Sequence, residues 1–239
     1  EEVTLPGDPV RIVELMVIPI KNKNDGKLSG RAIVAHDVTE RKQAENDLTD
    51  MNEILWGKIE EVESLRAQLQ EQAIRDPLTG LFNRRFFSET LEKETAQAVR
   101  DNSSLSFIIL DIDFFKKIND TYGHKCGDLV LQTFANFLSD NVRTGDSLCR
   151  FGGEEFVILM PNASTESAYE RAEVLRKQFE AMNIEFENQN IKSTFSAGVA
   201  TFPNHSASSE AVLSLADQAL YQSKANGRNC VTVYSVENV

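Results

Sequence analysis

One candidate site begins where an apolar run of the chain ends in carboxylates. Asp111 and Asp113 follow the run FIIL, and side chains two residues apart in a strand share a face. A carboxylate at the end of a buried strand is costly unless a cation or hydrogen-bond donors meet it. Asp111 with one glutamate from a neighbouring hairpin would form a hard-oxygen site suited to Mg²⁺, which keeps positions open for substrate phosphates. The alternative is a solvated strand end.

The glutamate would come from the stretch RFGGEEF. Two adjacent glycines suit a type I′ turn, which needs positive φ at both central positions. We therefore expect a tight hairpin with Gly152 and Gly153 at its tip, where the missing side chains let a ligand touch the backbone. Because strand neighbours point to opposite faces, only one of Glu154 and Glu155 should face the aspartates.

The elements that must position these acids alternate between strand and helix patterns. Strands alternating with helices of 14–19 residues indicate a layered α/β domain with helices packed on a central sheet. The expected strands are residues 104–113 and 193–202 and a hairpin of SLCRF with EEFVILM, and the expected helices are residues 129–142, 167–182 and 209–227.

Two β-rich runs precede this domain. Residues 10–20 and 28–38, joined by the turn-forming KNKNDGK, predict a hairpin that is too small to fold alone. The sequence of these two runs, which ends in HDVTERKQAE, resembles the last two strands of a PAS sensor domain. The resemblance implies that residues 1–39 are the C-terminal β-hairpin of a partial sensor domain, unless these strands pack on something else.

Residues 40–73 predict one long helix, because they contain neither proline nor a turn cluster and Thr39 offers an N-cap. Apolar residues recur at seven-residue intervals, which favours a left-handed coiled coil and therefore a parallel dimer stalk over residues 40–74. The alternative is an amphipathic helix lying on its own domain. The first core position holds Leu48, Leu55, Val62 and Leu69, and the second holds Met51, Lys58, Leu65 and Gln72, so the seam is imperfect.

The composition excludes some function classes. A net charge of −12 argues against a nucleic acid held mainly through its phosphates. Cys126, Cys149 and Cys230 form no C-x-x-C pair, which favours reduced cytosolic thiols over a zinc site or a disulfide framework. No apolar run reaches the roughly 18 residues that a membrane span needs, so we expect a cytoplasmic catalytic domain. A start at Glu1 favours a processed chain or a piece of a larger protein, which could itself be membrane-tethered.

Five sequence blocks within residues 75–235 allow a comparison with a known family. RDPLTGLFNRR, DIDFFKKINDTYGHKCGD, RFGGEEF, SAGVA and ALYQSKANGRN occur in this order. In order and spacing they resemble the GGDEF family of diguanylate cyclases. The resemblance implies for residues 75–239 a fold related to class III nucleotide cyclases and polymerase palm domains. It also implies condensation of two GTP into cyclic di-GMP and two pyrophosphates.

Carried over to this chain, the family's metal ligands are Asp111, the backbone carbonyl of Ile112 and Glu154, for Mg²⁺ or alternatively Mn²⁺. Glu154 also matches the proposed acceptor of the proton from the attacking 3′-hydroxyl. A metal-bound carboxylate is a weak base, so we expect metal positioning and charge neutralisation to be its main role. Glu155 occupies the fourth signature position, where the family accepts Asp or Glu.

The same resemblance implies the nucleotide contacts. Asn119 and Asp128 match the guanine readers, and a carboxylate can accept from guanine N1–H and the exocyclic amine, a pattern that adenine lacks. Without the family, Asn119 would indicate a turn and Asp128 a helix N-cap. His124 lies near this pocket in the family and either contacts substrate or makes a structural hydrogen bond.

The triphosphate contacts are also carried over from the family. Lys224 and Arg228 are four residues apart and should share one helical face, although a solvated basic helix end would have the same pattern. For Phe114 and Phe115, the alternative is that their rings only pack against neighbouring residues. The full set is Lys116, Lys224, Arg228 and the backbone amides of Phe114 and Phe115.

RTGD, five residues before the glycine pair, matches the family's product-inhibition motif Arg-x-x-Asp. Arg143 would bind guanine and phosphate of cyclic di-GMP, and Asp146 would accept from guanine. Tight inhibition in the family recruits a second arginine from the following helix. Val174 stands where that arginine is expected, with Arg171 and Arg176 as the available neighbours.

The sequence therefore predicts a GTP-dependent diguanylate cyclase whose two active sites meet across a dimer, with the stalk controlling how they meet. One alternative is a catalytically silent receptor for GTP or cyclic di-GMP. Silent members of the family usually lose the signature carboxylates, whereas Asp111, Glu154 and Glu155 are all present here. Another alternative is a cyclase that makes a hybrid guanine–adenine dinucleotide. In the family this relaxed choice of base is associated with loss of the Asp at position 128, which is present here.

Overall fold

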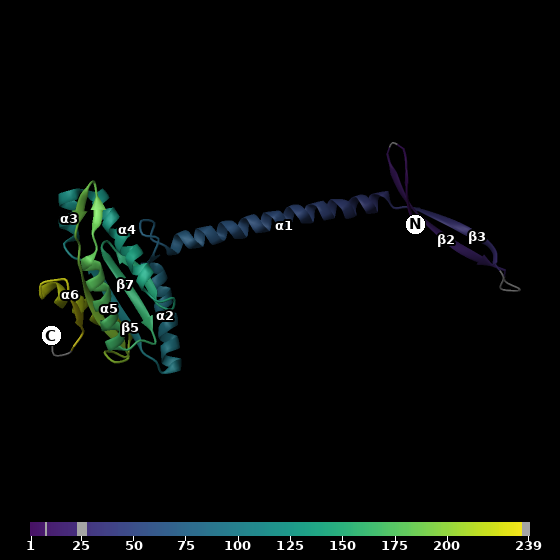
Figure 1. Ribbon diagram of the computed structural model, residues 1–239. Coiled ribbons are helices and arrows are strands. Elements are labelled where there is room, and N and C mark those ends of the chain that lie inside the picture. The colour runs from purple at the N-terminus through teal and green to yellow at the C-terminus, as the bar shows by residue number, and fades with distance from the viewer. Residues whose placement is uncertain (8, 23–27, 236–239) are drawn as a thin grey trace. The chain divides into compact units, whose positions relative to one another are not determined.

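The computed structural model describes residues 1–7, 9–22 and 28–235 (Figure 1). The chain divides into two compact units, Glu1–Gln68 and Leu69–Val239. Most of the predicted turn KNKNDGK, residues 23–27, lies outside the described residues. No helix in the described ranges is long and apolar enough to cross a membrane.

The described part of the first unit contains an antiparallel sheet in the order β1-β2-β3. The pairing of β2 (Arg11–Lys21) with β3 (Leu28–Asp37) confirms the predicted hairpin, whereas β1 (Glu2–Leu5) was not predicted. Met16 and Val17 point to opposite faces of β2, and their side chains are 54% and 55% exposed. Neither face of the sheet is therefore buried at that point.

Helix α1 covers Thr39–Ile74, close to the predicted range. Thr39 is its first residue and does not act as the predicted cap, because its Oγ1 accepts a hydrogen bond from the Ile12 N–H at 2.8 Å. The Asp37 carboxylate instead accepts from the Thr39 N–H at 3.1 Å. The six apolar residues of the seven-residue repeat are 51–63% exposed, so no described part of the chain covers this stripe; they are Leu48, Met51, Leu55, Val62, Leu65 and Leu69.

The second unit is built on a mixed sheet in the order β11-β10-β5-β7-β6-β4 within its described residues. All eight residues of the central strand β5 are buried, because helices cover both faces of the sheet, and this explains its continuous apolar run. The strands are β4 (Phe82–Asn83), β5 (Leu105–Ile112), β6 (Ser147–Gly152), β7 (Glu155–Pro161), β10 (Phe195–Phe202) and β11 (Val231–Val233).

Alternate residues of β5 enter two separate cores. Ile108 and Leu110 pack with helices α4 and α5, whereas Phe107 and Ile109 pack with helices α2 and α6. This confirms the predicted layered α/β class. The helices are α2 (Arg84–Asp101), α3 (Phe115–Tyr122), α4 (His124–Asn141), α5 (Thr165–Ala181) and α6 (Ser209–Ala225), and a small hairpin joins β8 (Ile184–Phe186) to β9 (Gln189–Ile191).

The predicted strands and the three predicted helices are present, but α2, α3 and the first turn of α4 were missed. Asn83 caps α2, since its side chain accepts from the backbone N–H groups of Arg85 and Phe86. Gly123, with φ of +83°, ends α3 and begins α4. This break is why a polar, glycine-containing stretch did not show as helix in the sequence.

Strand β10 and helix α6 meet at Gly198, where the two backbones are in contact. A Cβ atom on Gly198 would lie 2.1 Å from the Ala216 carbonyl oxygen and 2.2 Å from the Leu220 nitrogen. Neither backbone atom can move alone, so glycine is required at this crossing.

Gly198→Ala should lower the free energy of unfolding by about 3 kcal/mol, because α6 must move off the sheet. Gly57→Ala, in a helix position with no atom near the added methyl, is the matched control and should raise it by roughly 0.5–1 kcal/mol. Urea unfolding followed by circular dichroism measures both. Equal stability of Gly198→Ala and the wild-type chain would contradict the packing described.

Candidate functional site

Asp111 is the acidic centre of the site, at the end of β5. Its register partners are Glu155 on β7 and Ser196 on β10, so these side chains share its face of the sheet. Asp111 is 6% exposed, and its Oδ2 lies 2.7 Å from the Lys224 Nζ. Burial raises the pKa of Asp111 to about 6 against the opposing effect of Lys224, and the charges of Glu154 and Glu155 add to the rise.

Asp113 shares the face of Asp111 as predicted, but donors already surround its carboxylate. Its Oδ1 accepts from the Ser196 hydroxyl at 2.7 Å. Its Oδ2 accepts from the Thr194 hydroxyl at 2.7 Å and from the Asn229 N–H at 3.0 Å. Asp113 therefore binds the end of β5 to β10 and to the segment after α6, and this role was not predicted.

The signature turn differs from the prediction by one residue. β6 ends at Gly152 and β7 begins at its register partner Glu155, so the turn consists of Gly153 and Glu154. Gly153 has φ of +50° and Glu154 does not have positive φ, so the turn lacks the positive φ at both central residues that type I′ requires and matches the type II′ pattern in φ. A register shift between Arg150 and Gly152 displaces the tip.

This correction also changes the role of the two glutamates. Glu154 belongs to the turn, so strand alternation does not separate it from Glu155. Both carboxylates act on Asp111, as their contributions to its raised pKa show. Glu155 is the register partner of Asp111 and Glu154 lies in the turn, so the expectation that only one of them faces the aspartates stays a prediction.

The carboxylates at the end of β5 fit a divalent cation only if other ligands complete its coordination. Within the described residues, no group of three or more His, Cys, Asp or Glu side chains is placed to hold a metal alone. A hydrogen bond of 3.3 Å from the Ile112 N–H to the Glu154 carbonyl oxygen joins the strand end to the turn. Mg²⁺ typically uses one or two carboxylates and completes its shell with phosphates and water, so Asp111 and Glu154 suffice.

The loop between β5 and α3 carries the residues that were predicted to contact phosphate. Phe114 has φ of +56°, and α3 begins at Phe115, so the N–H groups of its first turn lack intrahelical acceptors. Lys116 in this turn is exposed. The loop thus presents backbone donors and a cation close to the acidic centre.

Lys224 and Arg228 do not share a helical face as predicted, because α6 ends at Ala225 and Arg228 has φ of +66°. The two side chains nevertheless converge. Lys224 pairs with Asp111, and the Arg228 guanidinium lies 4.5 Å from the centre of the Phe114 ring. The arginine also donates to the Lys224 carbonyl oxygen at 3.5 Å.

The predicted guanine readers lie on two facing helices. Asn119 is inside α3 and Asp128 is the fifth residue of α4, so the turn and N-cap interpretations were wrong. A Cβ atom on Gly127 would lie 1.9 Å from the Asn119 Oδ1, which shows how closely this amide packs on α4. His124 is the exposed first residue of α4, and its contact with substrate stays a prediction.

The RTGD segment forms a compact turn between α4 and β6. The Asp146 N–H donates to the Arg143 carbonyl oxygen at 2.9 Å, and the Arg143 N–H donates to the Asp146 Oδ2 at 3.2 Å. With Arg75, both residues line a cavity of about 290 Å³. Burial raises the pKa of Asp146, and the charges of Arg143 and Arg171 oppose the rise.

Of the two arginines available for this cavity, Arg171 is the one whose charge reaches Asp146. Arg176 is committed elsewhere, with ion pairs of 3.0 Å to both Glu173 and Glu180. Val174 is 47% exposed and offers no polar group. A second arginine is thus present one helical turn before the predicted position.

Arg150 is a positioning residue that sequence reasoning missed. Its Nε and Nη2 donate to the Gly153 carbonyl oxygen at 3.0 and 2.7 Å, and its Nη1 donates to the Asp76 Oδ1 at 2.8 Å. The Thr79 N–H and hydroxyl donate to the same Asp76 oxygen at 2.9 and 2.7 Å. The signature turn is therefore bound to the segment that directly follows α1. Asp76 and Arg150 lie in two of the five family sequence blocks, but nothing in the sequence indicates that their side chains are in contact.

Comparison with known proteins agrees with this geometry. Residues 73–230 match the family described as "Diguanylate cyclase, GGDEF domain". The chain is 39% identical over 218 residues to diguanylate cyclase DgcP of Pseudomonas aeruginosa, covering 87% of this chain and 32% of DgcP. It is 42% identical over 163 residues to the response regulator PleD of Caulobacter vibrioides, covering 67% of this chain and 36% of PleD.

Solved structures match as well. The coiled coil and GGDEF domain of DgcB from Caulobacter crescentus, in complex with c-di-GMP, has a TM-score of 0.72 at 30% identity, covering 80% of this chain and 98% of that chain. The active GGEEF domain of a diguanylate cyclase from Vibrio cholerae has a TM-score of 0.61 at 37% identity, covering 64% of this chain and 97% of that chain.

The domain has a mixed-sheet α/β fold, and the loop between β5 and α3 lies beside a group of carboxylates. The chain belongs to the GGDEF family of diguanylate cyclase domains. It spans about a third of the length of the curated relatives named above, at 32% and 36%.

The Asp76–Arg150 ion pair generates a pH prediction. Burial acts to raise the pKa of Asp76, but hydrogen bonds from Arg150 and Thr79 outweigh it and lower the pKa. The stabilisation is therefore present above the ordinary carboxyl pKa of about 4 and is lost as pH falls through the lowered folded value. Asp76→Asn should lower the free energy of unfolding by about 2 kcal/mol at pH 7, and the difference should shrink below about pH 4.

Glu71→Gln is the matched control, since Glu71 pairs with Arg75 in an exposed ion pair and should contribute less than about 0.5 kcal/mol. Chemical denaturation at several pH values measures these differences. A pH-independent effect of Asp76→Asn, or an equal effect of the two variants, would show that the Arg150 contact does not stabilise the charged carboxylate.

Proposed function

We propose that this chain is a diguanylate cyclase that condenses two GTP into cyclic di-GMP and two pyrophosphates. The observation that carries the proposal is the convergence of Asp111, Glu154 and Lys224 at the end of β5, beside the β5–α3 loop. Family membership supports it, as does the Vibrio cholerae relative, which is described as active and has a GGEEF signature like this chain.

Asp111, Glu154 and the Ile112 carbonyl would hold the cation, with Mg²⁺ preferred and Mn²⁺ as the alternative. When bound, the ion supplies Lewis-acid activation and charge neutralisation at the triphosphate. Lys224 neutralises part of the Asp111 charge in the free chain. With substrate present, its ammonium is expected to turn to a phosphate oxygen.

The remaining triphosphate contacts come from the loop and the end of α6. The N–H groups of Phe114 and Phe115 bind phosphate oxygens at the start of α3, together with Lys116. Arg228 is held in place by the Phe114 ring, so its guanidinium is oriented before substrate arrives. These groups orient the α-phosphate for in-line attack by a 3′-hydroxyl.

Asn119 and Asp128 would select guanine. Asp128 accepts from N1–H and the exocyclic amine, and Asn119 is held toward α4 by its close approach to Gly127. Retention of Asp128 favours GTP over a mixture of GTP and ATP. With Asp111, Glu154 and Glu155 also retained, we favour an enzyme over a silent receptor.

Each site binds one GTP, so we propose that two chains pair through α1 to bring two sites together. The exposed apolar stripe of α1 supports this pairing, and the DgcB structure is described as containing a coiled coil. We also propose that β1–β3 are the end of a PAS-like sensor domain and that the stalk sets turnover by controlling how the sites meet.

Arg143, Asp146 and Arg171 are proposed to bind cyclic di-GMP as a product inhibitor. The cavity of about 290 Å³ beside RTGD and the charge of Arg171 near Asp146 support this role. The solved DgcB structure is described as a complex with c-di-GMP. Inhibition should therefore persist although Val174 replaces the expected arginine.

The direct test is chromatography of GTP incubated with the chain and Mg²⁺, after its dimeric state is confirmed. Cyclic di-GMP should form, and Glu154→Gln should lower turnover roughly a hundredfold or more, since the ion supplies several kcal/mol of transition-state stabilisation. Glu185→Gln, at an exposed position on β8, is the control. Absence of any cyclic dinucleotide from a confirmed dimer would sink the proposal. Mainly mixed product from equal GTP and ATP would favour the hybrid cyclase.

Gly127→Ala tests the guanine pocket. The added methyl should displace the flexible Asn119 amide, raising the KM for GTP about tenfold through one lost hydrogen bond and changing kcat less. Gly57→Ala, with no atom near its added methyl and outside the guanine pocket, should leave the KM for GTP unchanged. A normal KM in a folded Gly127→Ala protein would exclude Asn119 as a guanine contact.

A further inference from the structure

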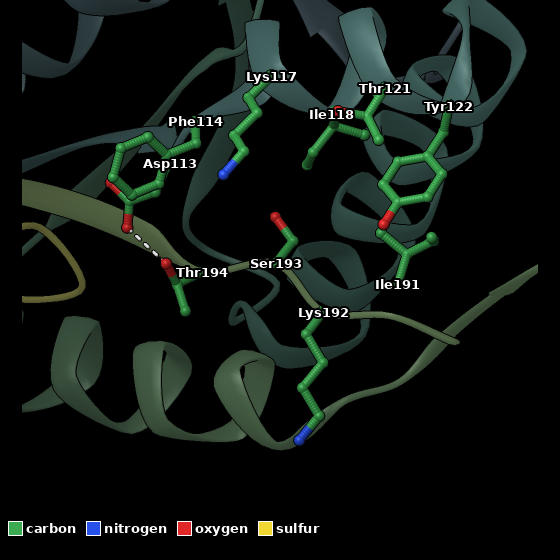
Figure 2. A pocket seen from close by; sticks show the side chains of 10 residues that line it. All are labelled: Asp113, Phe114, Lys117, Ile118, Thr121, Tyr122, Ile191, Lys192, Ser193 and Thr194. Carbon is green, nitrogen blue, oxygen red and sulfur yellow. Dashed lines mark hydrogen bonds between the residues drawn. The ribbon is translucent and has the colours of Figure 1, made fainter. Parts of the chain in front are cut away.

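A second cavity lies on a different face of α3 from the guanine readers. It has a volume of about 390 Å³ and lies between α3 and the segment joining β9 to β10 (Figure 2). Phe114, Lys117, Ile118 and Tyr122 line it from α3 and its N-cap, and Ser193 lines it from the segment. Among its lining residues only Phe114, whose backbone N–H is assigned to phosphate, also belongs to the proposed GTP site. The volume of the cavity is in the range of small-molecule sites, about 300–1,000 Å³.

The Ser193 hydroxyl is a buried donor that lacks a partner. Ser193 is 7% exposed, and its Oγ is the only buried side-chain polar atom in the described residues without a hydrogen bond. Figure 2 shows that this hydroxyl points into the cavity. Leaving such a group unpaired is unfavourable, so a bound acceptor would recover the lost hydrogen bond.

Lys117 contributes the second free donor. Figure 2 shows that its ammonium points into the same space. Lys117 makes no ion pair or hydrogen bond to any described residue. Lys192 is also on the rim but points away from the cavity, and its charge contributes to the lowered pKa of Glu180. The cavity therefore has one cation directed at its interior, in a chain of net charge −12.

The carboxylate on the wall does not neutralise these donors. Asp113 already accepts from Thr194, Ser196 and the Asn229 N–H, and Figure 2 shows the Thr194 bond. The polar groups of Ser193 and Lys117 thus remain for a ligand, and they favour an oxyanion.

The rest of the lining is apolar. Ile118 and Ile191 are 8% and 3% exposed and form the buried part of the wall. The rings of Phe114 and Tyr122 are 59% and 40% exposed and border the opening. An inorganic ion would leave this surface uncovered, whereas a molecule with an apolar body would bury it.

We propose that this cavity binds a small organic carboxylate with a flat apolar body. The carboxylate would meet the Ser193 hydroxyl and the Lys117 ammonium, and the body would lie against Ile118, Ile191 and Tyr122. The proposal does not depend on cyclase activity, because none of these side chains is assigned to GTP.

Benzoate is a suitable probe, and calorimetry on the full chain should give a dissociation constant of about 1 mM, as expected for so small a ligand. Benzamide, its neutral isostere, should bind about tenfold more weakly, and inorganic phosphate should bind weakly for want of an apolar body. A non-hydrolysable GTP analogue with Mg²⁺ should leave benzoate binding unchanged. Displacement by the analogue, or equal binding of benzoate and benzamide, would overturn the proposal.

Variants assign the site. Ser193→Ala and Lys117→Gln should each weaken benzoate about tenfold, whereas Lys192→Gln, the matched control, should change it less than about twofold. Ser193→Ala should melt no lower than the wild-type chain, because the hydroxyl has no partner to lose. A strong effect of Lys192→Gln, no effect of Lys117→Gln, or a lower melting temperature for Ser193→Ala would each contradict the assignment.

Discussion

The buried charge of Asp111 is the constraint around which the second unit is arranged. It ends a strand with eight buried residues, and Lys224 from α6 lies 2.7 Å away. The ammonium offsets the burial only in part, since the pKa of Asp111 is raised to about 6 and two glutamates stand beside it. In the proposed function, Lys224 neutralises part of this charge in the free chain and a cation bound with substrate would neutralise it during turnover.

Two networks hold the elements that meet at this charge. Asp113 accepts three hydrogen bonds and thereby binds β5 to β10 and to the segment that carries Arg228. Arg150 holds the Gly153 carbonyl oxygen and Asp76, so the turn that carries Glu154 is bound to the chain just after α1. Asn83 adds a hydrogen bond of 2.9 Å to the Ala73 carbonyl oxygen at the end of α1. A short series of hydrogen bonds therefore connects that helix end to the turn that carries Glu154.

Features that depend on short-range sequence patterns were predicted correctly, whereas features that depend on contacts between distant residues were missed. The strands around Asp111, the last two helices and the coiled-coil repeat follow from apolar periodicity, and five motif blocks predicted the site residues. The turn at Gly153 was misplaced because a register shift after Arg150 cannot be seen in composition. Asp76 and Arg150 are 74 positions apart, so only the folded sheet shows their contact. The free hydroxyl of Ser193 is likewise a property of packing.

The most direct test of the central claim is the binding of Mn²⁺, followed by electron paramagnetic resonance, to the chain with a non-hydrolysable GTP analogue. If Asp111 is the carboxylate that a cation neutralises, Asp111→Asn should weaken Mn²⁺ binding by at least about tenfold while the protein stays folded. Unchanged Mn²⁺ affinity in folded Asp111→Asn would contradict the account, because the buried charge would then serve only its ion pair with Lys224.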